Sequence, residues 1–403
     1  MTLAGVIRLY GLDAKSFWFD EFLTAHAARI SNWDDLVAWW RLWIDHPPLQ
    51  TWLTWLLRPL GGDEFVVRVP VALASTGAVG VMYALGATMY RPRVGVVSAL
   101  MLTLSPYAVW YGQEARPYAF ILLLTLLQML FAARVARRGL LRDWTTLGAV
   151  TILALYTSYL AIATTGAVVA YLAFRAIAPT MDPSGASAAA RPGPSESRLD
   201  RRSFALHGIA TGVVVGLAYL PWLPFLLAFV SRPDLGFGRI DTSHRPTLDE
   251  VTALLRSVDL GDVIVVALMV AGVLVSVGAV RRGRWRSSAL LGCWLGVGLG
   301  ILIVRAHGGV VTIWPRYLVY LAPAGLLLAA VGVDGIATAA SHFVPARRSV
   351  VTAMVVFVAL TFTVLLPAPR RVGEAYTAAK GEDYRGAARL IAEGTPPGAV
   401  VLA

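Results

Sequence analysis

The chain has 403 residues, of which 57% are hydrophobic and 15% are charged, and its mean hydropathy is +0.65. This number of charged residues is too small to cover the surface of a soluble globular protein of this size. The composition therefore indicates a multi-pass membrane protein. The net charge of +11 resides in short Lys and Arg clusters between apolar runs, which argues against a nucleic-acid partner. The single cysteine, Cys293, lies within an apolar run, so we expect no disulfide framework.

Apolar runs recur along the chain, and a helix needs about 20 apolar residues to cross a bilayer. Residues 1–12 offer little more than half of that, so we interpret them as a shortened first span, with an interfacial segment as the alternative. We recognise no cleavable signal peptide. Further spans are predicted at 66–90, 94–111, 117–135, 144–157, 160–178, 204–230, 262–280, 287–304, 317–338 and 349–367. This pattern predicts an all-α polytopic membrane protein with about 10–11 transmembrane helices.

Basic residues set the expected orientation, because cytoplasmic loops carry an excess of Lys and Arg. Arginine clusters occupy every second loop when 144–178 is counted as two short spans and not as one long tilted helix. The clusters are Arg91 with Arg93, 134–142, 191–202, 281–286, and Arg347 with Arg348. The extracytoplasmic parts are then 13–65, 112–116, 231–261, 305–316 and everything after 367.

We assign residues 1–367 to one transmembrane module, which includes the linker described next, and residues 368–403 to a segment beyond it. Residues 179–203 are rich in Pro, Ser, Ala and Gly and are typical of a flexible cytoplasmic linker. Residues 368–403 read as the start of a truncated extracytoplasmic segment, with an amphipathic helix at 380–393 and an apolar end. No internal repeat is evident, which argues against transporters built from repeated halves.

The first extracytoplasmic loop concentrates acidic side chains. Asp20 and Glu21 follow Trp18 and Phe19 at the outer end of the first span, where a partly desolvated carboxylate can act as a general base. A solvated pair that caps the next helix is the alternative. The loop region 13–64 holds eight of the 24 acidic residues of the chain: Asp13, Asp20, Glu21, Asp34, Asp35, Asp45, Asp63 and Glu64.

The rest of this loop is rich in tryptophan and proline. Residues 32–43 carry four tryptophans at a spacing typical of an amphipathic helix in the membrane interface, with stacking on a sugar as a second possibility. Asp45 and His46 precede two prolines, which fix an extended backbone before the next helix. Asp45 and His46 are therefore candidates for binding an acceptor or a sugar, although a simple hydrogen-bonding role explains His46 as well. No second histidine stands at metal-ligand spacing.

Two short outer loops carry arginines at the heads of helices. Glu114, Arg116 and Tyr118 lie in one of them, and Arg316 and Tyr317 lie in the other. Guanidinium groups that converge on one membrane face suit a lipid-linked phosphate, because their donors match phosphate oxygens. The alternative is that they pair with neighbouring residues and fix the helix ends. For Arg68, which opens a span, snorkelling to the interface is a sufficient explanation.

The order of these motifs along nearly the whole chain resembles the glycosyltransferase C (GT-C) superfamily. In particular it resembles the bacterial branch related to dolichyl-phosphate-mannose protein mannosyltransferases and to lipid A aminoarabinose transferase. The motifs are Trp18-Phe19-Asp20-Glu21, His46-Pro47-Pro48, Arg68-Val69-Pro70, Ser105-Pro106 followed by Gln113–Tyr118, and Pro315–Leu318.

The resemblance implies an integral membrane enzyme that moves a sugar from a polyprenyl-phosphate donor to an extracytoplasmic acceptor. It implies that Asp20 is the base with Glu21 beside it, and that Arg116 and Arg316 lie near the donor phosphate. The Asp45–Pro48 element then approaches the acceptor. Glu114, Tyr118 and Tyr317 are further candidates for contacts with the acceptor or the sugar.

We therefore expect an inverting glycosyltransferase of the bacterial plasma membrane, with its active site on the extracytoplasmic face. A flippase or permease for a lipid-linked glycan is the alternative, although the nearly uncharged spans argue against it. A non-enzymatic scaffold would leave the acids and arginines unexplained. The sequence predicts no organic cofactor, names neither the sugar nor the acceptor, and leaves a divalent metal open.

Overall fold

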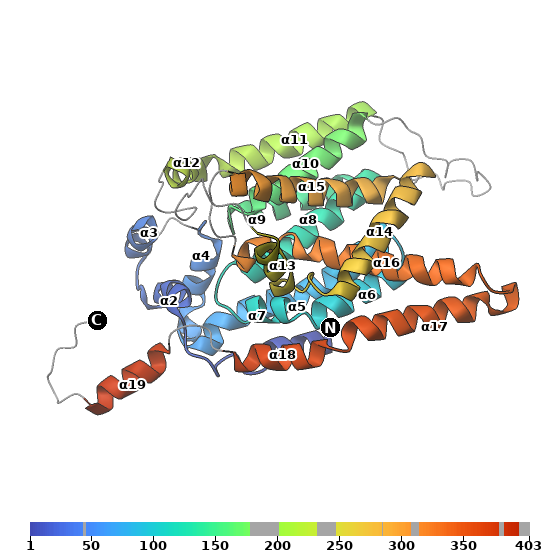
Figure 1. Ribbon diagram of the computed structural model, residues 1–403. Helices are drawn as coiled ribbons and strands as arrows, with labels where there is room; N and C mark the ends of the chain where they lie inside the picture. The colour runs from blue at the N-terminus through green and yellow to red at the C-terminus, as the bar shows by residue number, and fades with distance from the viewer. Residues whose placement is uncertain are drawn as a thin grey trace.

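The computed structural model describes residues 1–42, 46–177, 201–231, 247–283, 285–307, 314–378 and 383–394. Within these ranges every regular element is a helix, as the sequence predicts. The long helices form one bundle, and the helices of the first loop lie together at one end of it (Figure 1). The bundle consists of α5 (Glu64–Met89), α6 (Pro92–Thr103), α7 (Pro106–Gly112), α8 (Tyr118–Arg138), α9 (Leu141–Leu155), α10 (Ala161–Ile177), α11 (Arg201–Tyr219), α12 (Leu223–Ser231), α14 (Val263–Arg281), α15 (Arg286–His307), α16 (Ala322–Ser341) and α17 (Ala346–Leu365).

Shorter elements surround the bundle. The first loop, predicted to hold interfacial helices, contains three helices, and the segment after α17 contains two more, the second at the place of the predicted amphipathic helix. The short elements are α1 (Thr2–Leu9), α2 (Phe19–His26), η1 (Ala27–Arg29), α3 (Trp33–Leu42), α4 (Leu49–Leu56), η2 (Arg58–Leu60), η4 (Leu220–Trp222), α13 (Leu248–Ser257), η5 (Pro315–Leu318), α18 (Ala368–Thr377) and α19 (Tyr384–Gly394). Nearly all of the predicted linker, at 179–200, lies outside the described residues, and α11 begins directly after it.

Each predicted span has a helical counterpart, but several of these helices are shorter than a full crossing. Seven of the described stretches are long and apolar enough to cross a membrane, and an eighth qualifies if the bent pair α6 and α7 counts as one span. Helix α10 is apolar with 17 residues, α9 has 15, and α1 has only eight. The predicted number of about 10–11 thus includes helices that cross only part of a bilayer thickness.

Two spans that we predicted as continuous helices are interrupted at prolines. The span at 94–111 bends by 61° between α6 and α7, where Pro106 opens the second helix and Ser105 caps it by accepting a hydrogen bond from the Ala108 amide. The span at 204–230 passes through η4 at Pro221. Proline lacks the amide hydrogen that a continuous helix needs, and it disfavours helical backbone at the residue before it.

A buried arginine compensates for the bend. Because Pro106 has no N–H, the carbonyl of Leu102 loses its helical partner, and Arg8 of α1 donates to this oxygen at 2.9 Å and to that of Thr103 at 3.2 Å. The Arg8 side chain also donates to Ser75 Oγ at 2.7 Å, and it is fully buried. This network fixes the short helix α1 against α5 and the bend, since unsatisfied backbone groups are costly within a bilayer.

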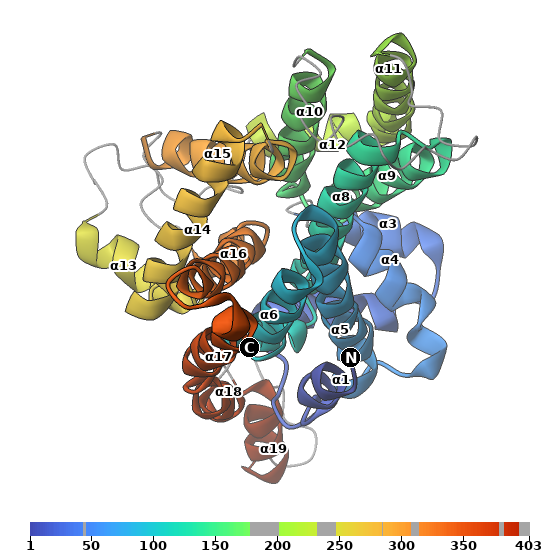
Figure 2. The ribbon, with the colours of Figure 1, turned by 90° about the vertical axis from the view of Figure 1, so that its right-hand side faces the viewer.

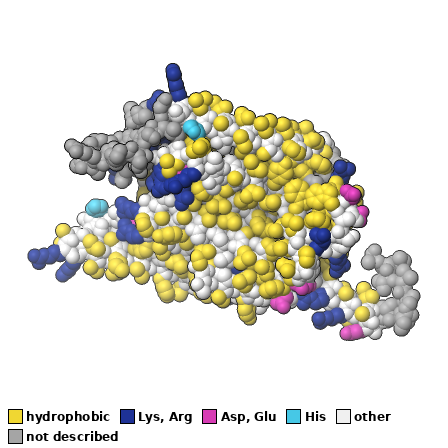
Figure 3. Space-filling model, turned by 180° about the vertical axis from the view of Figure 1, so that it is seen from behind, with side chains coloured by type: hydrophobic (Ala, Val, Ile, Leu, Met, Phe, Trp, Pro, Cys, Tyr) yellow, Lys and Arg dark blue, Asp and Glu magenta, His cyan; other side chains and the backbone are white. Residues whose placement is uncertain are grey.

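The centre of the bundle is formed by α5, α6, α8 and α16 (Figure 2). The apolar windows of α8 and α16 are 72% and 67% buried, whereas those of α11 and α17 are mostly exposed at the periphery. Helices α14 and α16 cross closely through Gly272 and Gly332, at which an added Cβ would overlap a backbone carbonyl of the other helix. On the face shown in Figure 3, a broad hydrophobic belt separates the largest group of Lys and Arg side chains from most of the acidic side chains in view.

The C-terminal helices hold the first loop. Lys15 Nζ donates to the carbonyls of Ala375 and Ala378 at the end of α18, at 2.9 and 2.6 Å. In α19, Arg385 forms an ion pair with Glu64 at 2.6 Å and donates to the Asp13 carbonyl at 2.9 Å. The beginning and the end of the described chain are therefore joined at the same end of the bundle.

Candidate active site

A cavity of about 480 Å³ lies between the first loop and the ends of the bundle helices. Its polar end is lined by Asp20 and His46 of the first loop, by Arg116 and by Arg316. Its other walls come from Tyr118, from residues 158–163, from α12 and α15, and from Tyr317 and Tyr320. Six separate parts of the sequence thus meet around one space, with charge at one end and mostly apolar side chains along the rest.

Asp20 lies between the two predicted arginines. Arg316 Nη1 donates to Asp20 Oδ2 at 3.2 Å, and Arg116 Nη2 lies 3.9 Å from the same oxygen. Arg116 also donates to the Asp20 backbone carbonyl at 3.2 Å. The Asp20 side chain keeps 22% of its surface exposed, so a ligand in the cavity can reach it. The three side chains thus lie together at one end of the cavity, and their assignment to a catalytic site stays a prediction.

The neighbouring acid has a different environment. Glu21 is fully buried, and its carboxylate accepts from Arg68 Nε at 2.8 Å, from Arg68 Nη2 at 2.6 Å and from the Ala115 amide at 2.7 Å. A carboxylate that is held by three donors and shielded from the cavity is suited to fixing a structure. We had predicted a catalytic role for Glu21 beside Asp20, and its position instead supports the loop that carries Arg116.

Arg68 was expected to snorkel to the interface, and this was wrong. Its side chain is 2% exposed and makes the two-pronged pair with Glu21. The remaining donors reach the carbonyls of Leu12, Lys15 and Ser16 at 2.7, 2.8 and 3.1 Å. Arg68 therefore holds the backbone just before α2 in place by hydrogen bonds. Through Glu21 it also links α5, the first loop and the loop before α8. The burial of Arg68 could not be predicted from the sequence, because Arg at the start of a span also fits snorkelling.

The other candidates divide into three groups. His46, Tyr118 and Tyr317 line the cavity together with Asp20. Glu114 is buried and lies outside the lining of the cavity. Asp45 lies outside the described residues.

Arg316 is held in place by its neighbours. It lies on η5, where Pro315 takes the first position and Tyr107 Oη donates to the Pro315 carbonyl at 2.9 Å. The guanidinium group lies over the rings of Trp314 and Tyr317, 5.3 and 5.6 Å from their centroids. These contacts aim the charge at Asp20 without a continuous helix beneath it.

Comparison with solved structures shows the same arrangement of helices elsewhere. ArnT from Cupriavidus metallidurans, bound to undecaprenyl phosphate, matches with a TM-score of 0.55 and 18% identity over 93% of this chain and 72% of that chain. AglB from Archaeoglobus fulgidus, in complex with an inhibitory peptide and a dolichol-phosphate, matches with a TM-score of 0.62 and 12% identity over 98% of this chain and 57% of that one. This chain has the GT-C fold.

Sequence comparison agrees with this fold over a shorter region. Residues 45–187 match the family model described as dolichyl-phosphate-mannose-protein mannosyltransferase. No curated protein matches the sequence. The predicted GT-C fold and the all-helical membrane architecture are confirmed.

The cavity that Asp20 lines, called the GT-C cavity below, has an apolar wall that the sequence motifs did not indicate. Tyr159 stacks on Phe229 of α12 with 4.5 Å between ring centroids, and both rings line the cavity. The other apolar lining residues are Leu160, Ile162, Ala163, Leu226, Val230, Ile301 and Leu302. Sequence reasoning missed them because an apolar residue on a membrane helix looks the same whether it faces lipid, another helix or a ligand.

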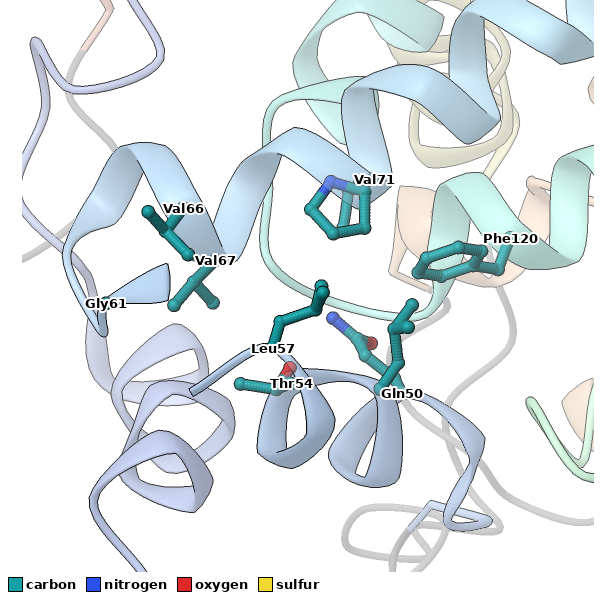
Figure 4. Close-up of a pocket in the computed structure, with 10 residues that line it drawn as sticks. Gln50, Thr54, Leu57, Gly61, Val66, Val67, Val71 and Phe120 are labelled. Carbon is teal, nitrogen blue, oxygen red and sulfur yellow. The ribbon is translucent and has the colours of Figure 1, made fainter. Parts of the chain in front are cut away.

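Two small pockets lie beside the GT-C cavity. One, of about 40 Å³, shares His46 and Arg116 with it and is also lined by Trp39 and Gln50. The other, of about 10 Å³, lies between α4, α5 and α8, where Gln50 and Thr54 face Val67, Val71 and Phe120 (Figure 4). The second pocket has room for one water molecule and no reactive group, so we assign it no chemistry.

A metal ion is known in one structure with this fold, the Archaeoglobus fulgidus oligosaccharyltransferase in complex with Zn and sulfate. That structure matches with a TM-score of 0.56 and 14% identity over 98% of this chain and 55% of that one. Within the described residues of our chain, no three His, Cys, Asp or Glu side chains come together as a metal site requires. Asp20 instead faces two guanidinium groups, and we derive no step through a metal ion.

Proposed function

We propose that the protein is a glycosyltransferase that transfers a sugar from a polyprenyl-phosphate donor to an acceptor of the cell envelope. The observation that carries the proposal is the position of Asp20, whose carboxylate meets Arg116 and Arg316 at the polar end of a long, mostly apolar cavity. The acid supplies a base, the arginines supply phosphate ligands, and the apolar walls accept a prenyl chain.

The proposed reaction is a direct displacement at the anomeric carbon. The acceptor hydroxyl or amine attacks this carbon as its proton passes to the Asp20 carboxylate. The bond between the anomeric carbon and the phosphate oxygen breaks, and polyprenyl phosphate leaves with the bonding electrons. Attack from the side opposite the leaving group inverts the anomeric configuration. Arg116 and Arg316 stabilise the negative charge that grows on the phosphate.

Donor binding also changes the state of Asp20. Without a donor, Arg316 pairs with this carboxylate at 3.2 Å. A donor phosphate competes for the same guanidinium donors, so its arrival weakens the ion pair and frees the carboxylate to accept a proton. The base is thus released when the leaving group is in place.

The comparisons support the donor class. The ArnT structure is described as bound to undecaprenyl phosphate and the AglB structure as in complex with a dolichol-phosphate. The family model that matches residues 45–187 is named for a dolichyl-phosphate-mannose donor. We propose that the acceptor approaches past His46 and Tyr317, and that the site faces the extracytoplasmic side of a bacterial plasma membrane.

The test is Asp20→Asn, which keeps the size of the side chain and removes its basicity. We expect the rate of sugar transfer from a polyprenyl-phosphate donor to fall at least about 100-fold, the usual contribution of a general base. Asp13→Asn is the matched control, because Asp13 is an exposed acid of the same loop outside the cavity lining. Sugar transfer should be measured in reconstituted vesicles.

Unchanged turnover in Asp20→Asn would reject the assigned base. Reconstituted vesicles also separate the flippase alternative. A flippase moves the intact donor across the bilayer, whereas a transferase releases polyprenyl phosphate in proportion to the glycosylated product.

A further inference from the structure

A second polar cavity, of about 380 Å³, lies at the opposite end of the bundle from the candidate active site. It is formed where α5, α8 and α14 end and α6 and α15 begin, with one wall from α16. Three arginines from three separate segments line it: Arg91 in the turn between α5 and α6, Arg137 in the last turn of α8, and Arg286 in the first turn of α15. None of these residues belongs to the proposed glycosyltransferase site.

The charges of this cavity do not balance. Asp334 is its one lining carboxylate among the described residues, and it is shared between Arg91 at 3.6 Å and Arg93 at 3.0 Å. Arg137 has no carboxylate within ion-pair distance in the described part of the chain. Arg286 is close enough to Arg137 for their charges to repel each other. Arg91 and Arg93 share one carboxylate and Arg137 has none among the described residues, so these three guanidinium groups carry two positive charges more than Asp334 balances.

Polar and apolar groups divide the cavity in the way that a lipid requires. Hydroxyl groups of Ser276, Ser287 and Ser288 and the half-buried ring of Trp285 lie near the arginines. The remaining walls include the apolar side chains Met89, Val94, Val275 and Val331. A free phosphate ion would leave these apolar walls uncovered, whereas the chains of a lipid would cover them while its phosphate meets the arginines.

We propose that this cavity binds an anionic phospholipid of the leaflet at the arginine-rich end, by its phosphate headgroup. Arg137 and Arg286 hold the phosphate oxygens, and Val275 and Val331 contact the first part of the acyl chains. Basic pockets between transmembrane helices are a known way to recognise such headgroups. The bound lipid would join α8, α14 and α15 at an end where the protein alone leaves like charges facing one another.

The experiment uses the full chain, purified in a neutral detergent and titrated with phosphatidylglycerol while bound lipid is counted by native mass spectrometry. The double variant Arg137→Gln/Arg286→Gln should bind this lipid about 25-fold more weakly, at about fivefold for each charge near an anionic headgroup. The matched control Arg347→Gln/Arg348→Gln removes two exposed charges from α17, outside the cavity lining, and should change binding less than about twofold.

Two further arms test the apolar wall and separate the sources of the phosphate. Val275→Trp fills the apolar wall without a change of charge, and it should also abolish phosphatidylglycerol binding. Phosphatidylcholine and inorganic phosphate should each bind at least about tenfold more weakly than phosphatidylglycerol. Equal losses in the cavity variant and the α17 control would overturn the proposal. Binding of phosphatidylcholine or inorganic phosphate as tight as that of phosphatidylglycerol would overturn it too.

Discussion

Asp20 and Glu21 are adjacent in sequence and have opposite surroundings. Successive residues of a helix point about 100° apart, so α2 turns Asp20 toward the cavity and Glu21 toward Arg68. Glu21 also accepts from the Ala115 amide and thereby fixes the residue before Arg116. One carboxylate is thus open to a ligand, and the other positions the arginine that faces it.

This difference predicts different effects of substitution. Glu21→Gln leaves Arg68 buried without its counter-charge, and the loss of one partner of a buried pair costs about 3–5 kcal/mol. We expect Glu21→Gln to lower the melting temperature and the yield of folded protein, whereas Asp20→Asn should keep both near the parent values. Thermal unfolding in detergent, with size-exclusion profiles as a check, measures this. Parent-like stability of Glu21→Gln would contradict the structural role.

Some residues of the candidate site could be predicted from the sequence and others could not. Asp20, Arg116 and Arg316 could be found because ionisable side chains at membrane depth on the outer face are uncommon and need a reason. The role of Arg68 could not be found, since a charge at a span end fits both the surface and a buried pair. The burial of Glu21 depends on an amide and a guanidinium group from distant segments, which no local pattern encodes.

At the scale of elements, glycines decide how closely helices approach. The crossing of α14 and α16 is possible because Gly332 presents no side chain to the Leu268 carbonyl. Gly332→Ala should force the helices apart and destabilise the protein by roughly 1–3 kcal/mol, the usual range for overpacking. Gly296→Ala on α15, where an added Cβ meets no atom within 4 Å, is the control. Equal melting temperatures for both variants would refute the assigned role of this crossing.

A titratable side chain ties the turn between α13 and α14 to α7. Asp259, at a positive φ of 62°, accepts from Ser105 Oγ at 2.5 Å and from the Tyr107 amide at 3.2 Å, which ties this turn to α7. Burial raises the pKa of its carboxyl from 3.8 to about 6. The folded state therefore binds a proton more tightly than the unfolded state does.

The raised pKa of Asp259 predicts that the stability of the protein depends on pH. Since the pKa of Asp259 is raised on folding, its contribution to stability is fully present below about pH 4 and is lost as the pH rises through about 6. The full change is up to about 3 kcal/mol, at 1.36 kcal/mol for each pKa unit. Melting temperatures between pH 4 and pH 7 should fall more steeply for the parent than for Asp259→Asn, which keeps a similar shape and tolerates a positive φ. Parallel curves would show that Asp259 does not titrate in this range.

At the scale of the whole molecule, the separation of charges along the bundle predicts its orientation. On the face shown in Figure 3, the largest group of Lys and Arg side chains lies at one end, and the acidic side chains in view lie mainly at the other. The excess of Lys and Arg should keep its end in the cytoplasm. We expect a membrane-impermeant maleimide to label Asp13→Cys in intact cells and to label Arg348→Cys only after permeabilisation. Both positions are exposed, and Cys293→Ala provides the background. The reverse pattern of labelling would invert the proposed topology.

The sequence predicts the architecture of this molecule better than the path of each helix. Apolar runs and basic loops located every long helix, because length and charge alone determine them. The bend before α7 and the break at η4 occur at prolines that were visible in the sequence. Which prolines interrupt a span depends on whether another group satisfies the freed carbonyl, as Arg8 does at Leu102.

The union of the chain's two ends has a consequence for biosynthesis. A ribosome makes Asp20 early, but Arg316, its ion-pair partner, emerges 296 residues later, and the α18 residues that receive Lys15 follow after that. During much of translation Asp20 therefore lacks Arg316, whereas Glu21 can already meet Arg68 and the Ala115 amide. The support beneath the proposed active site can thus form early, and the site itself is completed only after the segment that carries Arg316 has been made.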